Sequence, residues 1–173
     1  SRLSFDAQYL YLSFDSKQLI EHISKFLLYL KNNAVFDGVI KVIISRTSEG
    51  RGYKSKKFAP SNYFIVHSLL PELIHEKCTQ GVNLRLCEYR LPLSSIPGVK
   101  HLNRLDQVLA RIEWDDYDKN GVLIHDGIML NHSGDIVETT CANIFWVKSG
   151  VVYTPDLMSQ GIKGVIRKRI ISL

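Results

Sequence analysis

The stretch GVKHLNRLDQVLAR, residues 98–111, sets a lysine between a Pro-Gly turn and an amphipathic segment. Proline followed by glycine is a strong turn signal, and here the pair is Pro97 and Gly98. Beyond Lys100, apolar residues recur at the spacing of one helical face, which predicts a helix with a buried side. These residues are Leu102, Leu105, Val108 and Leu109. Because lysines are rarely buried, Lys100 by itself is interpreted as a solvated residue near a helix start.

The composition indicates an ordinary globular protein. A chain of 173 residues with 45% hydrophobic and 23% charged residues suits one domain or two small ones. No apolar run approaches the roughly 20 residues of a membrane helix, and the first residues lack the order of a signal peptide. We therefore expect a cytoplasmic protein that does not enter a membrane.

Cysteines and basic residues exclude two further classes of site. Cys78, Cys87 and Cys141 have no metal-ligand spacing, so we expect reduced thiols and no metal site. The net charge of +5 is spread along the chain, with small clusters only at 54–58 and 163–169. No nucleic-acid-binding motif accompanies these clusters, so we expect no nucleic acid as a partner.

Periodicity and turn signals divide the chain into a small α/β unit over residues 1–70, a connector over 71–80 and a second unit over 81–173. In the first unit we expect two helices within 6–31, separated by a turn at 13–16, and strands at 38–46 and 62–70. In the second unit we expect a strand at 82–91, the helix after Lys100, strands at 126–131 and 135–148 joined at Ser133-Gly134, a strand at 150–155 and a closing segment at 161–173. Both ends stop inside helical patterns without caps, which predicts that the chain is a piece of a longer protein.

Two further features could carry chemistry together with Lys100. Glu138 follows an apolar strand, where a lone glutamate is usually solvated. The segment QGIKGVIRKR, residues 160–169, has a G-x-x-G pattern leading into a helix. Such a pattern is commonly a simple turn and cap, but exposed N–H groups at a helix start also bind anions. The histidines show no metal spacing, and His101 is interpreted as structural.

Taken in order, four segments resemble the fold-type IV pyridoxal-phosphate-dependent enzymes, the branched-chain and D-amino-acid aminotransferase-like family. Within that family they are most similar to the aminodeoxychorismate lyases, because KHLNRL followed by QVL is characteristic of them. The segments are 41–53, 98–111, 134–157 and 161–170. The resemblance implies an α/β (α+β) fold of two domains, one small α/β domain and one larger barrel-like domain. It also implies a homodimer.

The resemblance implies pyridoxal 5'-phosphate as cofactor and a role for each matching residue. Lys100 would bind the cofactor as a Schiff base and then shuttle a proton, as only a primary amine can. Glu138 would pair with the ring nitrogen and keep it protonated. The phosphate would be bound by Arg2 and by the backbone of the G-x-x-G turn, at Ile162, Gly164, Val165 and Ile166. Ile166 stands where the aminotransferases often have threonine, so that hydroxyl contact is absent.

Other residues would shape the site in the same family picture. Asn143 and residues 139–142 would line the far edge of the cofactor, although TTCANIFW is also a sound strand sequence. Arg46, Arg51 and Tyr53 lie on the loop after the first strand and are candidates for binding substrate carboxylates, since arginine offers a bidentate fork.

The leading hypothesis is a lyase that converts 4-amino-4-deoxychorismate to 4-aminobenzoate and pyruvate, a step toward folate. The first alternative is a branched-chain or D-amino-acid aminotransferase of the same fold, because the lysine and the glutamate are shared by all of these enzymes. The second alternative is a catalytically silent fragment or a basic binding module.

Overall fold

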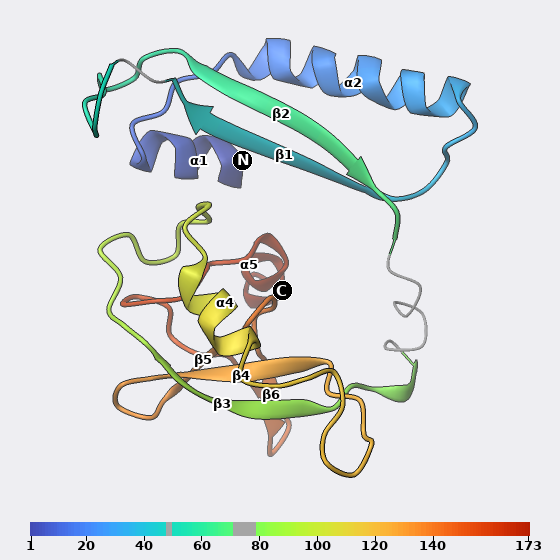
Figure 1. Cartoon of the computed structure of the whole chain (residues 1–173), viewed down its shortest axis with the longest axis vertical. Coiled ribbons are helices and arrows are strands. Elements are labelled where there is room, and N and C mark those ends of the chain that lie inside the picture. Colours follow the sequence, from blue (N-terminus) through green and yellow to red (C-terminus); the bar gives the residue numbers. More distant parts are fainter. Residues whose placement is uncertain (48–49, 71–78) are drawn as a thin grey trace. The chain divides into compact units, whose positions relative to one another are not determined.

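The computed structural model describes residues 1–47, 50–70 and 79–173, and the chain forms two compact units, Ser1–Glu76 and Lys77–Leu173 (Figure 1). Most of the 71–80 connector predicted from the sequence lies outside the described residues. In the part of the chain that the structure describes, no helix has the length and apolar character needed to cross a membrane.

The first unit is a pair of helices with an antiparallel hairpin. Helix α1 spans Arg2–Tyr9 and helix α2 spans Ser16–Asn32, while strands β1, Val39–Arg46, and β2, Ser61–Ser68, pair along their whole length. Helix α2 begins where the sequence predicts because Asp15 caps it, accepting from the backbone N–H groups of Lys17 and Gln18 at 2.8 and 3.1 Å. The helix runs along the hairpin, and its His22 hydrogen-bonds the hydroxyl of Tyr63 on β2 (Figure 1).

The second unit is built on a three-stranded sheet in the order β3-β4-β5. Strands β3, Leu84–Leu91, and β4, Asp126–Asn131, are parallel, and β5, Ile136–Thr139, is antiparallel to β4. Parallel neighbours need a crossover, and helix α4, Leu105–Arg111, supplies it and packs against β3 and β4 (Figure 1). A short hairpin, β6 at Trp146–Lys148 and β7 at Val151–Tyr153, and helix α5, Val165–Ile171, complete the unit.

One apolar cluster lies between this sheet and α4. Its members are Cys87, Leu91, Ala110, Trp114, Met129, Val137 and Leu157. Burial, with the nearby carboxylate of Glu113 as a second cause, raises the pKa of the Cys87 thiol to about 11, so this cysteine stays protonated and packs as a small apolar residue. The core thus holds strands β3, β4 and β5 in place, and β5 carries Glu138.

The predicted long strand at 135–148 is wrong, because a tight turn divides it into β5 and β6. The hydroxyl of Thr139 accepts the N–H of Ala142 at 2.8 Å, and the N–H of Thr139 donates to the carbonyl of Ala142 at 2.8 Å. Threonine side chains that bond local backbone in this way compete with the strand ladder. The β4–β5 hairpin around Gly134 forms as predicted, with Asn131 and Asp135 bonded across the turn.

The predicted buried face of the helix after Lys100 is also wrong. Helix α4 begins only at Leu105, and the side chains of Leu102, Leu105 and Val108 are 68%, 61% and 53% exposed. The helix turns Ala110 and its polar side toward the sheet instead.

The residue just beyond α4 bonds to β3 where that strand has an irregularity, between Leu86 and Arg90. Glu113, just beyond the helix, accepts the N–H groups of Glu88 and Tyr89 at 2.7 and 2.6 Å. These bonds satisfy backbone donors that the ladder leaves unpaired. Periodicity therefore grouped the leucines on one face correctly, but it could not show that a carboxylate would decide which face turns inward.

The core predicts a sharp contrast between the two methionines of the chain. Met129 on β4 is fully buried and pairs with Glu138, so Met129→Ala should lower the free energy of unfolding by about 2–5 kcal/mol in urea denaturation. Met158 is 65% exposed, and Met158→Ala should change the same quantity by less than about 0.5 kcal/mol. Equal losses in the two variants would contradict this assignment of the core.

Candidate functional site

Lys100 is held by a turn that is tied to the 161–163 segment through the main chain. The N–H of Gly98 donates to the carbonyl of Gly161 at 2.9 Å, and the N–H of Lys163 donates to the carbonyl of Gly98 at 3.0 Å. Gly98 has φ +81°, a conformation that side-chain-bearing residues rarely adopt, and a Cβ there would meet Lys163. Val99 is 1% exposed and anchors the turn, while Lys100 itself is exposed.

Glu138 is a buried carboxylate at the end of β5, only 4% exposed. Its Oε2 accepts the N–H of Ile162 at 2.9 Å. Burial raises the pKa of Glu138, and the Ile162 N–H, the charges of Arg104 and Lys100 and the Gln107 amide all oppose that rise. The structure therefore places Lys100, Glu138 and the 161–166 turn near one another, and their roles toward a cofactor stay predictions.

Asn143 fastens the turn that leads into α5. Its Nδ2 donates to the carbonyl of Ile162 at 2.8 Å, and its Oδ1 accepts the N–H of Gly164 at 3.2 Å. A Cβ on Gly164 would lie 2.2 Å from that Oδ1, so only glycine leaves room for the clamp. Asn143 thus has a positioning contact in this structure; its contact with a cofactor stays a prediction.

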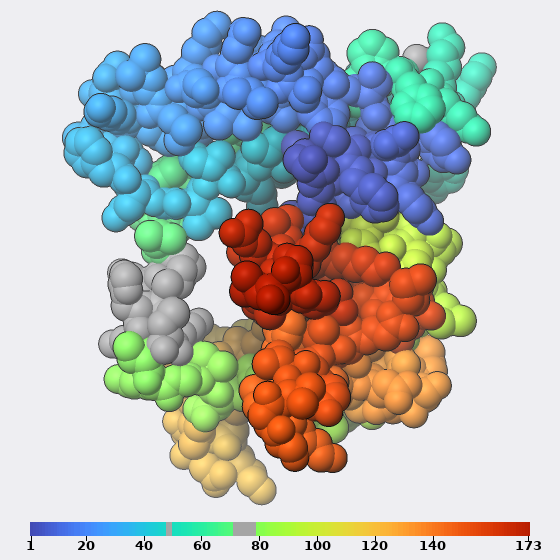
Figure 2. All heavy atoms as spheres, turned by 180° about the vertical axis from the view of Figure 1, so that it is seen from behind, coloured from blue at the N-terminus to red at the C-terminus, as the bar shows by residue number. Residues whose placement is uncertain are grey.

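Helix α5 starts directly after this clamp, with Gly164 as its N-cap. The first N–H groups of a helix have no partner inside it. Val165 and Ile166 occupy this first turn with side chains 53% and 71% exposed, and Figure 2 shows the closing residues, in dark red, at the molecular surface. The backbone that the sequence assigns to an anion is therefore at an accessible helix start.

Asp126 supports the candidate site structurally, and the sequence did not indicate this role. It is 8% exposed at the start of β4 and accepts from the N–H and hydroxyl of Thr140, from the Cys141 thiol and from the N–H of Gly127. Burial raises its pKa, but hydrogen bonds from Cys141, Thr139, Thr140 and Gly127 outweigh that and lower it overall. Asp126 therefore holds the 139–142 turn that follows Glu138, and an aspartate opening the strand DGIMLN was the one available signal.

Arg104 and Gln107 were missed as well, although both belong to the KHLNRLDQVL segment. Both oppose the rise in the pKa of the Glu138 carboxyl, Gln107 through its side-chain amide and Arg104 through its charge. Burial lowers the pKa of Arg104, and the carboxylates of Glu138 and Asp106 oppose that change. Sequence reasoning treated this segment only as a helix and a family marker, so it gave these polar residues no role.

Two of the predicted anion-binding arginines lie in the first unit, where each has a partner. Arg2 on α1 approaches Asp6 at 3.8 Å. Arg46 at the end of β1 donates to the hydroxyl of Ser55 at 3.1 Å and to the carbonyl of Leu10 at 2.6 Å, so it fastens the loop between the strands. Their contacts with phosphate and with substrate stay predictions.

Arg51 and Tyr53 lie on the loop between β1 and β2, and both are exposed. Tyr53 has a fully exposed side chain. Their proposed part in binding substrate carboxylates also stays a prediction.

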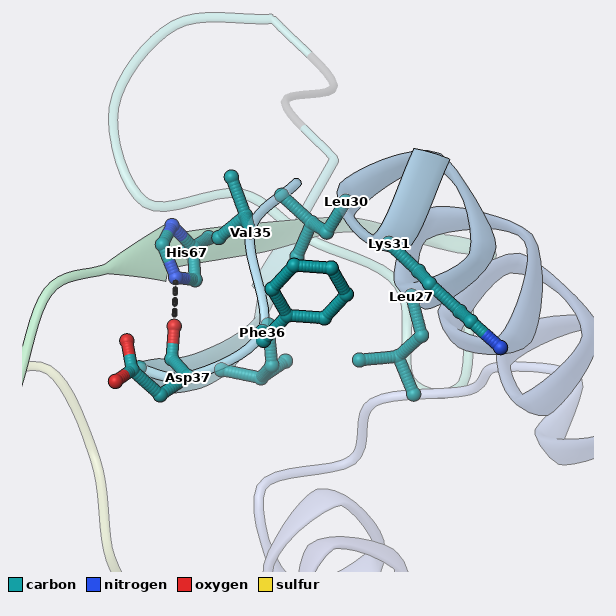
Figure 3. A pocket seen from close by; sticks show the side chains of 9 residues that line it. Leu27, Leu30, Lys31, Val35, Phe36, Asp37 and His67 are labelled. Atoms are coloured by element: carbon teal, nitrogen blue, oxygen red, sulfur yellow. Dashed lines mark hydrogen bonds between the residues drawn. The ribbon is translucent and has the colours of Figure 1, made fainter. Parts of the chain in front are cut away.

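Each of the two units contains a cavity. In the first, a cavity of about 260 Å³ lies between the end of α2 and the following loop, next to the imidazole of His67, which bonds the carbonyl of Asp37 at 3.0 Å (Figure 3). In the second, a more polar cavity of about 220 Å³ adjoins the Glu138 network, with Arg104, Gln107, Gln160 and Gly161 in its wall. Within the described ranges, no group of three or more potential ligands is arranged to hold a metal ion.

Comparison with known proteins agrees with this geometry. The family model "Amino-transferase class IV" matches residues 1–173. Aminodeoxychorismate lyase of Vibrio harveyi is 38% identical over 133 residues, which is 76% of this chain and 47% of that protein. The chain spans about half the length of the curated relatives it matches.

Solved structures give the same relationship. The crystal structure of 4-amino-4-deoxychorismate lyase from Pseudomonas aeruginosa aligns with a TM-score of 0.83 and 32% identity over 99% of this chain and 60% of that one. Branched-chain amino acid aminotransferase of Escherichia coli aligns with a TM-score of 0.76 over 99% and 56%, and its 23% identity shows the shared fold alone.

Fold and site together define a mixed α/β protein of fold-type IV, the class of pyridoxal-phosphate enzymes inferred from the sequence. The chain belongs to the class IV aminotransferase family. Both the predicted fold class and the predicted resemblance are confirmed.

Pyridoxal 5'-phosphate is the cofactor of this family, and the residues present fit it. The pKa of the buried Glu138 carboxyl is raised, which indicates that the nearby positive charges do not fully offset its burial. The protonated ring nitrogen of the cofactor would be a further cationic partner for this carboxylate. Lys100 supplies the amine close by, and the start of α5 supplies backbone donors suited to a phosphate.

The raised pKa of Glu138 predicts a pH dependence of stability in the cofactor-free protein. Because the folded-state pKa lies above the ordinary 4.5, the stabilising contribution is present below pH 4.5 and is lost as pH rises through the folded-state value. Glu138→Gln removes this loss. The free energy of unfolding of Glu138→Gln minus that of the wild type should increase with pH, as measured by urea denaturation at stepped pH. The increase should be about 1.4 kcal/mol for each pH unit by which the folded-state pKa of Glu138 exceeds its ordinary value.

Asp126→Asn is the matched comparison of opposite sign. Since the pKa of Asp126 is lowered from 3.8, its contribution is present above that value and is lost as pH falls through the folded-state pKa. This variant should therefore be destabilised most at neutral pH and least in acid. A pH-independent difference for Glu138→Gln would show that burial does not perturb its carboxyl group.

Proposed function

We propose that the protein is an aminodeoxychorismate lyase, which cleaves 4-amino-4-deoxychorismate to 4-aminobenzoate and pyruvate in folate biosynthesis. The observation that carries the proposal is that the 161–163 segment bonds both the Gly98 turn that precedes Lys100 and the Glu138 carboxylate. The similarity to two lyases, at 38% and 32% identity, supports this reaction over others of the fold.

In this proposal each residue has a task that its position suits. Pyridoxal phosphate, when bound, supplies an electron-accepting ring and an aldehyde carbon for an amine. The Nζ of Lys100 would hold the cofactor and, when free, would remove the proton from the amine-bearing carbon of the substrate. Loss of that proton lets the ether C–O bond break, so the carbocycle becomes aromatic and the released enolpyruvate takes up a proton to give pyruvate.

Glu138 and the 161–166 turn orient the reaction without taking part in bond cleavage. The carboxylate of Glu138 would keep a proton on the ring nitrogen, which makes the ring a better electron acceptor. The backbone of Ile162, Gly164, Val165 and Ile166 would hold the phosphate, and Asn143 keeps that turn in shape through its bonds to Ile162 and Gly164. We further propose a cytoplasmic homodimer with a small-molecule substrate.

A branched-chain or D-amino-acid aminotransferase is the second candidate. It is supported by the shared fold of the Escherichia coli branched-chain enzyme, and the lysine and glutamate would serve both reactions. A silent fragment or basic binding module is the third, and it predicts no cofactor binding.

Lys100→Ala in the full-length protein tests the proposal. With 4-amino-4-deoxychorismate, the wild type should release pyruvate, measured by coupled NADH oxidation, and the variant should be slower by about 100-fold or more because its acid-base group is gone. The visible absorption band of lysine-bound cofactor should also vanish. Lys148→Ala, on the exposed strand β6, should change neither readout.

The alternatives give different results in the same experiment. Turnover of an amino acid with 2-oxoglutarate and no pyruvate from the chorismate derivative would replace the lyase by the aminotransferase. Absence of an absorption band after incubation with added pyridoxal phosphate would favour the binding module.

A further inference from the structure

Arg104 and Gln107 stand on the same side of the crossover helix, turned away from its exposed leucines. Arg104 is the N-cap of α4 and Gln107 lies three residues further, a spacing that aligns side chains on one helical face. Both residues are partly buried, whereas Leu105 and Val108 between and beside them are exposed. The polar side of the helix start is therefore turned into the second unit, where both residues line its cavity.

The cavity of the second unit connects these residues with the carboxylate. Its wall includes Arg104, Gln107, Gln160 and Gly161. A Cβ on Gly161 would lie 3.3 Å from the Oε2 of Glu138, so the carboxylate stands directly behind this glycine. The cavity thus forms a polar space of about 220 Å³ beside the one buried glutamate of the candidate site.

Several buried polar atoms around this space have unmet hydrogen-bonding capacity. In the described part of the chain, Arg104 Nη2, Gln107 Oε1 and Gln160 Oε1 are buried without a hydrogen-bond partner, and Gln160 is only 6% exposed. The Nε of Arg104 donates to the carbonyl of His101 at 3.3 Å, which fixes the guanidinium in place. Leaving such groups unpaired destabilises the fold, so the presence of these groups is better explained by a role other than stability.

We propose that Arg104 and Gln107 are positioning residues for Glu138: Gln107 orients the carboxylate by a hydrogen bond, and Arg104 supplies the permanent positive charge that keeps it ionised. The significance for catalysis rests on the proposed function, in which an ionised Glu138 pairs with the ring nitrogen. The action of Arg104 on Glu138 is a property of this chain that holds whatever reaction the site performs.

Arginine suits this role better than the neighbouring lysine. The charges acting on Glu138 are those of Arg104 and Lys100, and the neutral donors are the Ile162 N–H and the Gln107 amide. The charge of Lys100 depends on the bonding of its amine, which must change if that amine reacts. A guanidinium stays protonated at any working pH, so Arg104 can hold the charge of Glu138 constant while Lys100 does chemistry.

The test is a titration of the Glu138 carboxyl carbon by NMR in the cofactor-free full-length protein labelled at glutamate, with the resonance assigned by its loss in Glu138→Gln. Arg104→Gln should move the Glu138 midpoint upward by about one pH unit or more, because the nearby opposite charge is removed. Arg104→Lys should restore most of the shift. Gln107→Leu should move the midpoint upward by less, since it removes a neutral donor.

Arg85→Gln is the matched control. Arg85 is a partly buried arginine of the same unit that approaches Glu113 at 3.6 Å and lies over the Trp114 ring, and it is not among the groups acting on Glu138. It should leave the Glu138 midpoint unchanged. An unchanged midpoint in folded Arg104→Gln, or an equal shift in Arg85→Gln, would overturn the proposal. If Arg104→Gln does not fold, Arg104→Met, which keeps an unbranched side chain without the charge, takes its place, and an unchanged Glu138 midpoint in that variant overturns the proposal.

This experiment separates the inference from the proposed function. The titration is carried out without cofactor or substrate, so it does not depend on which reaction occurs. A protein that shows the Arg104-dependent shift but releases no pyruvate would sink the lyase proposal alone, and a lyase without the shift would sink only the positioning role.

Discussion

Burial of one carboxylate is the constraint on which the second unit depends. Glu138 is nearly inaccessible at the end of a short strand, and a charge in such a place is tolerated only with hydrogen bonds and opposite charge around it. The partners come from separate segments: the Ile162 N–H from the turn before α5, and the Gln107 amide from the crossover helix. The crossover helix, strand β5 and the turn before α5 must therefore all fold for the Glu138 carboxylate to be stabilised.

How far the sequence could predict this arrangement depends on the range of each interaction. Lys100, Glu138 and the 161–166 turn were predictable because a family resemblance carries residues that lie far apart in the chain. Strands β1, β2 and β4 were predictable from local patterning. The break after Thr139, the inward side of α4 and the role of Asp126 were not, because each depends on a hydrogen bond to a distant backbone or side chain. Amphipathic periodicity groups residues on a face without saying what that face meets.

Fold and family do not distinguish a lyase from an aminotransferase. A lysine amine and a paired carboxylate are general tools of pyridoxal-phosphate chemistry, so lyases and aminotransferases share both. The TM-scores of 0.83 and 0.76 for one of each reflect this common framework. Differences between the reactions have to come from side chains around the shared pair. Arg104 and Gln107 line the cavity of this unit and oppose the rise in the pKa of Glu138, and they belong to the segment that resembles the lyases.

The tie between the lysine turn and the 161–163 segment is made by backbone atoms, from Gly98 to Gly161 and from Lys163 back to Gly98. Contacts of this kind depend on chain geometry and hardly at all on which side chains surround them. Evolution can therefore exchange the residues next to Lys100 with little effect on where its amine is held, provided that the glycine remains. An insertion or deletion of even one residue in either segment would shift the pairing and separate the amine from the 161–166 turn. The lengths of the two segments, more than the side chains around them, therefore set the position of the amine.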